Sequence, residues 1–194
     1  MVFSENQSHA GEQHTVRFNP LYIYQLEIYD DIIPVAVEYV DFTDRLCTGT
    51  IEMHRSLERT IRNLFRVGLE INFPFNLVAP ASEFDWEDER LMAQNVTSGF
   101  NYRLIAGTQR PSSHSFGMAI DINPVQNPYI RYSQDAIITK PEGAIYEFEK
   151  PGTLFSDHPL VRLLKQDGWI WGGGWTRGSG RIDYQHFEKQ QANP

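Results

Sequence analysis

A carboxylate inside an apolar run is the feature that most restricts how this chain can fold. The run is "MAIDINP", residues 118–124, in which Asp121 stands between two isoleucines. Burial of a carboxylate is strongly unfavourable unless the group is paired or bound to a metal. Strand alternation places Ala119 and Asp121 on one face and the apolar residues 118, 120 and 122 on the other, toward the core. The pattern therefore predicts a strand that presents Asp121 to a site.

Two histidines can complete such a site. His114 precedes the run, and a backbone bend at Gly117 would return it to the face of Asp121. A zinc site of catalytic type needs three protein ligands and a fourth, open position. His186, in "DYQHFE", is the third candidate, because it follows a glycine-rich turn and has Asp183 three residues before it. With this spacing one residue can bind the metal while the other reaches the metal-bound water.

The other histidines are weaker candidates. His9 and His14 lie in a polar N-terminal segment, and His54 precedes a predicted helix on a solvated turn. His158 lies at the start of another predicted helix, where its expected role is capping, with metal binding as the alternative. A single cysteine, Cys47, excludes an internal disulfide and a multi-cysteine zinc site.

Charge and hydropathy exclude two classes of partner. The chain of 194 residues has 17 basic and 25 acidic residues, a net charge of −8, and no basic cluster. Nucleic acid is therefore not an expected partner, because phosphate binding requires concentrated positive charge. No segment approaches the roughly 18 apolar residues of a membrane span, and residues 1–14 have no signal-peptide pattern. The sequence indicates neither compartment nor oligomeric state.

Periodicity predicts an α+β protein, because helices and strands mix without regular alternation. Strands are expected within 20–42, around Asp30-Asp31 and Pro34, and at 99–107, with Arg103 on the face opposite Phe100. Helices are expected at 56–70, with Ser56 as N-cap, at 85–96, and from residue 157 or 158 to Gly168. Residues 124–155 show little periodicity and are predicted to be a long loop. The C-terminal "WIWGGGWTRGSGRIDYQHFE" predicts a strand, a glycine-rich turn and a last strand or turn.

These residues also carry a family resemblance. Ser112, His114, Gly117, Ala119 and Asp121 form the pattern SxHxxGxAxD, and an acidic residue, two positions and a histidine follow near the C-terminus. This arrangement resembles the zinc D-alanyl-D-alanine carboxypeptidases, a group that includes L-alanyl-D-glutamate endopeptidases of bacterial cell walls and phage endolysins. The similarity extends through "YVDF", "GTIEMH", "FNYRLIAGTQRP" and "GWIWGGGW", over about residues 35–190.

The resemblance implies an architecture. It is a single domain with a central, mostly antiparallel sheet flanked by helices, the fold of these enzymes and of the hedgehog-like zinc peptidases. We expect a zinc peptidase domain at 17–190, a polar N-terminal tail at 1–16 and a C-terminal tail at 191–194.

The resemblance also implies roles for individual residues. His114, Asp121 and His186 match the ligands of Zn²⁺, and Asp183 matches the carboxylate that acts as general base. Arg103 matches an arginine that stabilises the oxyanion or holds the scissile carbonyl. Pairing with a surface acid is the alternative for this arginine.

Two further residues are expected to contact substrate. Ser112 matches the motif serine that hydrogen-bonds substrate or orients a ligand, with a turn or cap role as the alternative. Trp175 is expected in the wall of the cleft. It belongs to the turn that also contains Trp169 and Trp171, of which at least one is expected in the core.

The expected function is that of a bacterial zinc-dependent metallopeptidase acting on peptidoglycan stem peptides. Asp rather than Glu at position 183 favours the L-alanyl-D-glutamate endopeptidase type over the D-alanyl-D-alanine carboxypeptidase type. Residues 124–155 are expected to shape substrate choice. One alternative is a non-catalytic, zinc-containing cell-wall or peptide-binding module, and another is an enzyme on a different substrate. Family members act at the cell wall, in the periplasm or outside the cell, or remain cytoplasmic until phage-type release.

Overall fold

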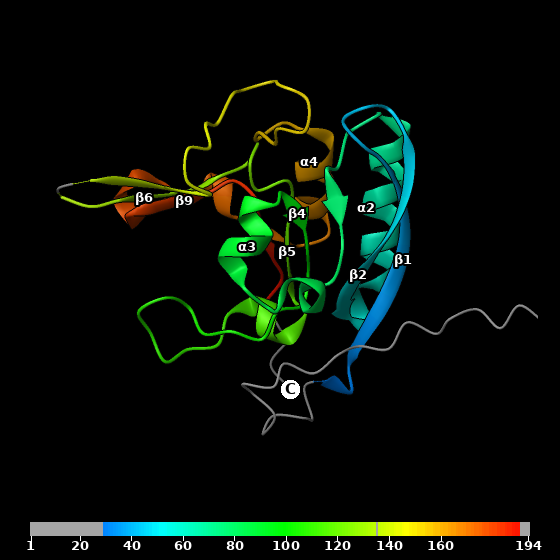
Figure 1. The fold of residues 1–194 in the computed structure, drawn as a ribbon, viewed down its shortest axis with the longest axis horizontal. Coiled ribbons are helices and arrows are strands. Elements are labelled where there is room, and N and C mark those ends of the chain that lie inside the picture. Colours follow the sequence, from blue (N-terminus) through cyan, green and yellow to red (C-terminus); the bar gives the residue numbers. More distant parts are fainter. Residues whose placement is uncertain (1–28, 135, 191–194) are drawn as a thin grey trace, which may run out of the picture.

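The computed structural model describes residues 29–134 and 136–190 (Figure 1). The predicted tails at 1–16 and 191–194, and the part of the predicted strands before residue 29, lie outside the described residues. The helices are α2 (Glu58–Glu70), α3 (Asp88–Ala93) and α4 (Pro159–Gln166), with 3-10 turns at Arg55–Leu57, Ala81–Phe84, Ser113–Phe116, Gly172–Gly174 and Arg177–Ser179. The strands are β1 (Ile32–Val40), β2 (Leu46–His54), β3 (Leu77–Val78), β4 (Val96–Thr97), β5 (Ala119–Asp121), β6 (Tyr129–Tyr132), β7 (Ile137–Lys140), β8 (Ile170–Trp171), β9 (Arg181–Asp183) and β10 (His186–Glu188).

A long hairpin with a helix packed on it forms one side of the protein. β1 pairs antiparallel with β2, from Ile32 opposite His54 to Val40 opposite Leu46, and α2 lies beside this hairpin in Figure 1. The helix predicted at 56–70 is thus confirmed. Its buried residues have the expected spacing: Ile61, Leu64, Phe65 and Gly68.

The start of this helix differs from the prediction. α2 begins at Glu58, after the 3-10 turn, and Ser56 does not cap it. The Nδ1 atom of His54 instead accepts a hydrogen bond from the Ser56 backbone N–H at 3.2 Å. The prediction of Ser56 as N-cap was therefore wrong, because the acceptor comes from the end of β2.

The remaining strands form small sheets. The antiparallel orders are β5-β10-β8 and β7-β6-β9, and β3 pairs with β4 in a two-residue parallel ladder. The predicted α+β class and mostly antiparallel pairing are confirmed, with the pairing spread over several small sheets. Between the hairpin and these sheets lies a core to which α2 contributes Leu64, α4 contributes Leu164, β5 contributes Ile120 and β10 contributes Phe187. Among the described helices, none has the length and apolar character that a membrane crossing requires.

Two predicted elements end early or do not form. The helix predicted at 85–96 covers only Asp88–Ala93, because Asp85, Trp86 and Asn95 have φ values of 58°, 57° and 56°, in the left-handed region. Residues 99–107 form no strand, so that prediction was wrong. The Phe100 N–H donates to the Glu52 carbonyl at 2.7 Å, but this hydrogen bond is not part of a strand ladder.

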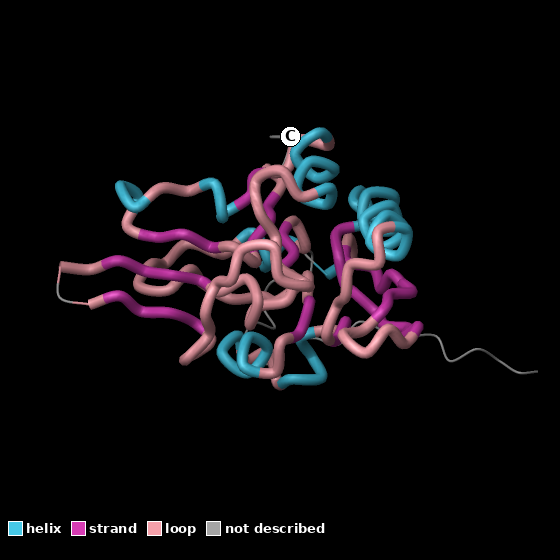
Figure 2. Tube along the Cα trace, turned by 90° about the horizontal axis from the view of Figure 1, so that it is seen from above, coloured by secondary structure: helices cyan, strands magenta, loops and turns pink. Residues whose placement is uncertain are grey.

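The segment predicted to be a long loop contains a hairpin instead. β6 and β7 pair from Tyr129 opposite Lys140 to Tyr132 opposite Ile137. Figure 2 shows this hairpin extending away from the rest of the protein. Buried Asn127 anchors its base, since Nδ2 donates to the carbonyls of residues 122, 123 and 152 while Oδ1 accepts the 154 N–H. The loop prediction was wrong because four-residue strands between prolines show little periodicity.

The expected cap of the last helix is confirmed. Nδ1 of His158 accepts the Leu160 N–H at 3.3 Å, Pro159 occupies the first turn, and Gly168 follows the helix with a φ of 81°. The ring is buried between Phe73 and Phe155. Burial lowers the pKa of His158 to about 4, and the nearby charge of Arg162 adds to this shift.

This cap predicts a pH-dependent stability. The folded pKa of His158 lies below its unfolded value, so its full contribution is present above about pH 6.5 and is lost as the pH falls toward 4. We expect the free energy of unfolding to fall by about 1 kcal/mol between pH 7.5 and pH 5 from this group. An unscreened shift would give a loss of about 2 kcal/mol over this pH range, and we expect roughly half of it because solvent screening reduces the effect.

Urea unfolding at both pH values measures this loss. His158→Asn is the matched variant, because Asn caps well and does not titrate. The difference in stability between the wild type and this variant should shrink by about 1 kcal/mol on acidification. A difference independent of pH would contradict the assignment.

Candidate metal centre

The pairing of β5 with β10 places two candidate ligands side by side. His186 lies directly opposite Asp121 in this antiparallel ladder. Opposed residues project from the same face with Cβ atoms about 5 Å apart. On β5, Ile120 is fully buried in the core, as the alternation predicts. Residues 65 positions apart in the chain thus meet through backbone pairing alone.

The third candidate ligand enters from a 3-10 turn before β5. Ser112 caps this turn by accepting the His114 backbone N–H at 3.4 Å. Gly117 ends it with a φ of 63°, and its N–H donates to the His114 carbonyl at 3.0 Å. The bend predicted at Gly117 is present, and it brings His114 to the Asp121 face.

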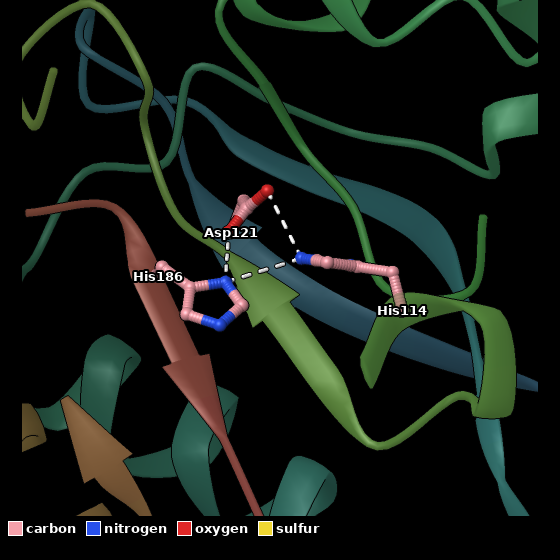
Figure 3. Close-up of side chains that lie close together, drawn as sticks. All are labelled: His114, Asp121 and His186. Atoms are coloured by element: carbon pink, nitrogen blue, oxygen red, sulfur yellow. Dashed lines mark hydrogen bonds and ion pairs between the residues drawn. The ribbon is translucent and has the colours of Figure 1, made fainter. Parts of the chain in front are cut away.

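The three side chains converge on one point (Figure 3). Nε2 of His114 lies 3.1 Å from Oδ2 of Asp121, and Nδ1 of His186 lies 3.0 Å from Oδ1 of the same carboxylate. The two imidazole nitrogens are 3.2 Å apart. The three ligand atoms lie within 4.8 Å of one another, and all three residues are almost fully buried. This group could hold a metal ion.

Neighbouring groups orient both imidazoles. The Gly99 carbonyl lies 2.6 Å from Nδ1 of His114, which assigns the proton to that nitrogen and leaves Nε2 as the lone-pair donor. Oε2 of Glu188 lies 3.5 Å from Nε2 of His186 and accepts a hydrogen bond from the Ser113 hydroxyl at 2.5 Å. Sequence reasoning missed Gly99 and Glu188. The available signal for Glu188 was its position two residues after His186 on the same strand face.

The electrostatics of the group suit a divalent cation. Burial alone would raise the pKa of Asp121, but the two histidines outweigh it and hold that pKa well below its usual range. Burial opposes the charge on His186, yet its hydrogen bonds to Asp121 and Glu188 raise its pKa to about 10. A metal ion could take the place of the proton that His186 holds against the ionised Asp121. The group offers two nitrogens and one carboxylate oxygen, and a catalytic zinc site has three protein ligands of these kinds. The residues therefore fit zinc.

Asp183 lies on β9, outside the close triad. Its Oδ1 atom is buried and has no hydrogen-bond partner in the described ranges. Burial raises the pKa of Asp183 to about 6; the charge of His186 opposes this shift and that of Asp121 adds to it. The glycine-rich turn makes room for this residue, since a Cβ at Gly172 would lie 2.9 Å from the Asp183 Cβ. A carboxylate close to neutral pKa beside the triad is suited to proton transfer.

Arg103 and Ser112 engage in contacts that match their alternative roles. The Arg103 guanidinium forms an ion pair with Asp88 at 3.0 Å, and its Nε is buried without a partner among the described residues. The Ser115 hydroxyl binds both the N–H and the carbonyl of Arg103, which ties this arginine to the turn of His114. Ser112 is the cap of that turn. Contacts of either residue with substrate stay predictions.

The tryptophans divide between core and site. Trp169 and Trp171 are buried, as expected for at least one member of this turn. Trp175 is half-buried, and its ring centroid lies 5.8 Å from that of His186. The guanidinium of Arg181 covers the same indole at 4.7 Å. Trp175 is thus a neighbour of the triad, and its role in substrate binding stays a prediction.

Substitution of Gly117 tests the bend that delivers His114. A Cβ at this position would lie 2.5 Å from the His54 nitrogen, in addition to the unfavourable φ of 63°. We expect Gly117→Ala to destabilise the protein by about 3 kcal/mol, measured by urea unfolding. Gly143→Ala is the matched control, since its φ is 78° and a Cβ at that position would meet no atom within 4 Å. The control should cost about 1 kcal/mol, and equal losses would contradict the steric account.

Comparison with known protein families found one family model that matches part of this chain. Residues 106–189 match the family described as D-alanyl-D-alanine carboxypeptidase. The matched range contains His114, Asp121, Asp183 and His186, whereas Arg103 lies just before it. Comparisons with curated proteins and with solved structures gave no match. Over residues 106–189, this chain is therefore similar to the D-alanyl-D-alanine carboxypeptidase family.

Proposed function

We propose that this protein is a zinc-dependent metallopeptidase that hydrolyses peptide bonds in peptidoglycan stem peptides. The observation that carries the proposal is the buried group of His114, Asp121 and His186 inside a segment that matches a peptidase family. The family implies a peptide substrate, and the donor set fits zinc. Both the L-alanyl-D-glutamate endopeptidase and the D-alanyl-D-alanine carboxypeptidase types are compatible with this site. Asp183 in place of glutamate supports the first.

His114, Asp121 and His186 would hold the zinc ion, which would supply Lewis-acid chemistry at the site. Asp183 would take the proton released as water attacks, and then return it to the leaving amine. The raised pKa of Asp183 supports both transfers, because a group with a pKa of about 6 accepts and returns a proton near neutral pH. Glu188 and the Gly99 carbonyl would hold the two imidazoles in place during the cycle.

Arg103 would stabilise the negative charge that develops on the carbonyl oxygen. Its unpartnered, buried Nε offers a donor for this purpose, and its backbone is tied to the turn that carries His114. Preorganised donors of this kind favour the transition state over the substrate. The ion pair with Asp88 would orient the guanidinium and leave other N–H groups available for the oxyanion, because only one of its nitrogens is engaged at 3.0 Å.

Mass spectrometry of muropeptides after incubation with the zinc-loaded protein tests this function. The expected result is a set of products whose masses identify one cleaved stem-peptide bond, with one zinc per chain by elemental analysis. Loss of alanine from the stem terminus would indicate the carboxypeptidase type, and release of the whole stem the endopeptidase type. A protein that binds zinc and stem peptides but releases no product would overturn the enzyme and support a binding module.

A further inference from the structure

Two arginines share a sheet face with Asp183. Arg181 precedes Asp183 by two residues on β9, so both side chains project from the same side of the strand. On the neighbouring strand β6, Arg131 lies directly opposite Arg181, and Tyr129 lies opposite Asp183. The register thus places both arginines on the sheet face that carries the proposed general base.

The backbone bonds bring these arginines close. The Tyr132 N–H donates to the Gly180 carbonyl at 2.9 Å, one position beyond the arginine pair. Hydrogen-bonded and non-hydrogen-bonded pairs alternate in an antiparallel ladder, so Arg131 and Arg181 form a non-hydrogen-bonded pair. Side chains in such pairs lie closer together than in the alternative. Like charges directly opposite each other destabilise a sheet, and Arg131 and Arg181 are nonetheless opposite each other in this protein.

No carboxylate compensates these two charges within the described ranges. Arg131 is exposed and forms no ion pair or hydrogen bond through its guanidinium with a described residue. Arg181 is also exposed, and its guanidinium lies over the Trp175 ring. On β7 of the same sheet, by contrast, Lys140 is paired with Glu89 at 2.8 Å. In a chain of net charge −8, this positive pair, which has no carboxylate partner among residues 29–134 and 136–190, is suited to an anionic ligand.

The pair connects to the triad through Trp175. That indole lies under Arg181 at 4.7 Å and beside His186, with 5.8 Å between ring centroids. A peptide bound at the triad can therefore reach Arg181 with a neighbouring group. Guanidinium groups bind carboxylates through two parallel hydrogen bonds, and a stacked arginine is held in a suitable orientation.

We propose that Arg131 and Arg181 bind a carboxylate of an acidic peptide substrate, and so select acidic peptides for the triad. The inference rests on the proposed peptidase function and specifies its substrate class. The free carboxylates of stem peptides are the groups that this pair takes. Replacement of those carboxylates by carboxamides removes the negative charge with little change in shape.

Isothermal titration calorimetry tests the selection without turnover. The probes are a synthetic stem peptide with free carboxylates and the same peptide with those groups amidated, titrated into zinc-loaded protein that carries Asp183→Asn. In this background, Arg131→Gln and Arg181→Gln should each weaken binding of the acidic peptide about tenfold and that of the amide less than twofold. Arg66→Gln on α2 removes the same charge elsewhere and should leave both affinities unchanged. Arg181→Lys should recover part of the loss.

Kinetics on the otherwise native enzyme provide a second readout. Both Gln variants should raise KM for the acidic peptide about tenfold and change kcat less than twofold, because the pair acts in binding. Equal losses for acidic and amidated peptides, equal losses in Arg66→Gln, or no binding of the acidic peptide by the parent would overturn the proposal. Calorimetry gives this answer even if no bond is cleaved, so failure of the proposed function remains distinguishable.

Discussion

Asp183→Asn is expected to reduce kcat for stem-peptide hydrolysis about 10³-fold while zinc binding persists. Asparagine keeps the size of the side chain but cannot accept and return a proton at neutral pH, and general acid–base groups contribute about 10²–10⁴-fold to rates. Zinc should stay bound because Asp183 is outside the group of atoms that could hold the metal. Steady-state rates and zinc content, measured on the same preparations, check both parts of the result.

The control for this variant is Asp157→Asn, which removes the charge of an exposed carboxylate before α4. It should retain full activity. If Asp183→Asn kept more than a tenth of the wild-type rate with zinc bound, another group would have to act as the base. Loss of zinc together with activity would instead make Asp183 a metal ligand.

The second large effect concerns the triad and the thermal stability of the protein. A ligand that binds only the folded state at a thousandfold excess over its Kd stabilises by about 4 kcal/mol. For a chain of this length that corresponds to a rise in Tm of about 10 °C. We expect zinc to raise Tm by this amount, and a chelator to reverse the rise. Differential scanning calorimetry at one protein concentration measures both.

Asp121→Asn should abolish most of this zinc-dependent rise, because it removes the charge that both histidines face. His158→Asn is the control, since it replaces a buried histidine outside the triad and should leave the rise intact. An unchanged zinc response in Asp121→Asn would show that the metal binds elsewhere. Loss of the response in His158→Asn would show that the zinc-dependent rise in Tm reports general stability rather than metal binding at the triad.

The triad was predictable because its chemistry is concentrated in two short segments. Asp121 stood out as a carboxylate in a buried strand, and Gly117 supplied a bend with a definite backbone requirement. His186 was identified as the third candidate from its position after the glycine-rich turn, whereas its strand pairing with Asp121 is a finding of the structure. The helices α2 and α4 were predictable for a similar reason, since their apolar spacing is local information.

The missed features depend on contacts that leave no local pattern. The acceptor for His114 is the Gly99 carbonyl, and a backbone oxygen has no residue signature. The β6–β7 hairpin consists of four-residue strands, too short for alternation to distinguish them from a loop. The expected strand at 99–107 had suitable residues, with Phe100 and Tyr102 buried, but its N–H groups found partners in β2 and the His114 turn. Tertiary contacts decided each of these cases.

Phe187 gives the triad a dependence on the interior of the protein. It lies between His186 and Glu188 on β10, is fully buried opposite Ile120, and stacks on Trp171 with ring centroids 6.2 Å apart. A slip of one residue would turn His186 into the core and expose this phenylalanine. Burial of Phe187 in the core thus fixes the strand register that aligns the ligands. Zinc affinity in this protein should therefore depend on core packing. Substitutions in the core should change it even where the substituted residue contacts none of the ligands.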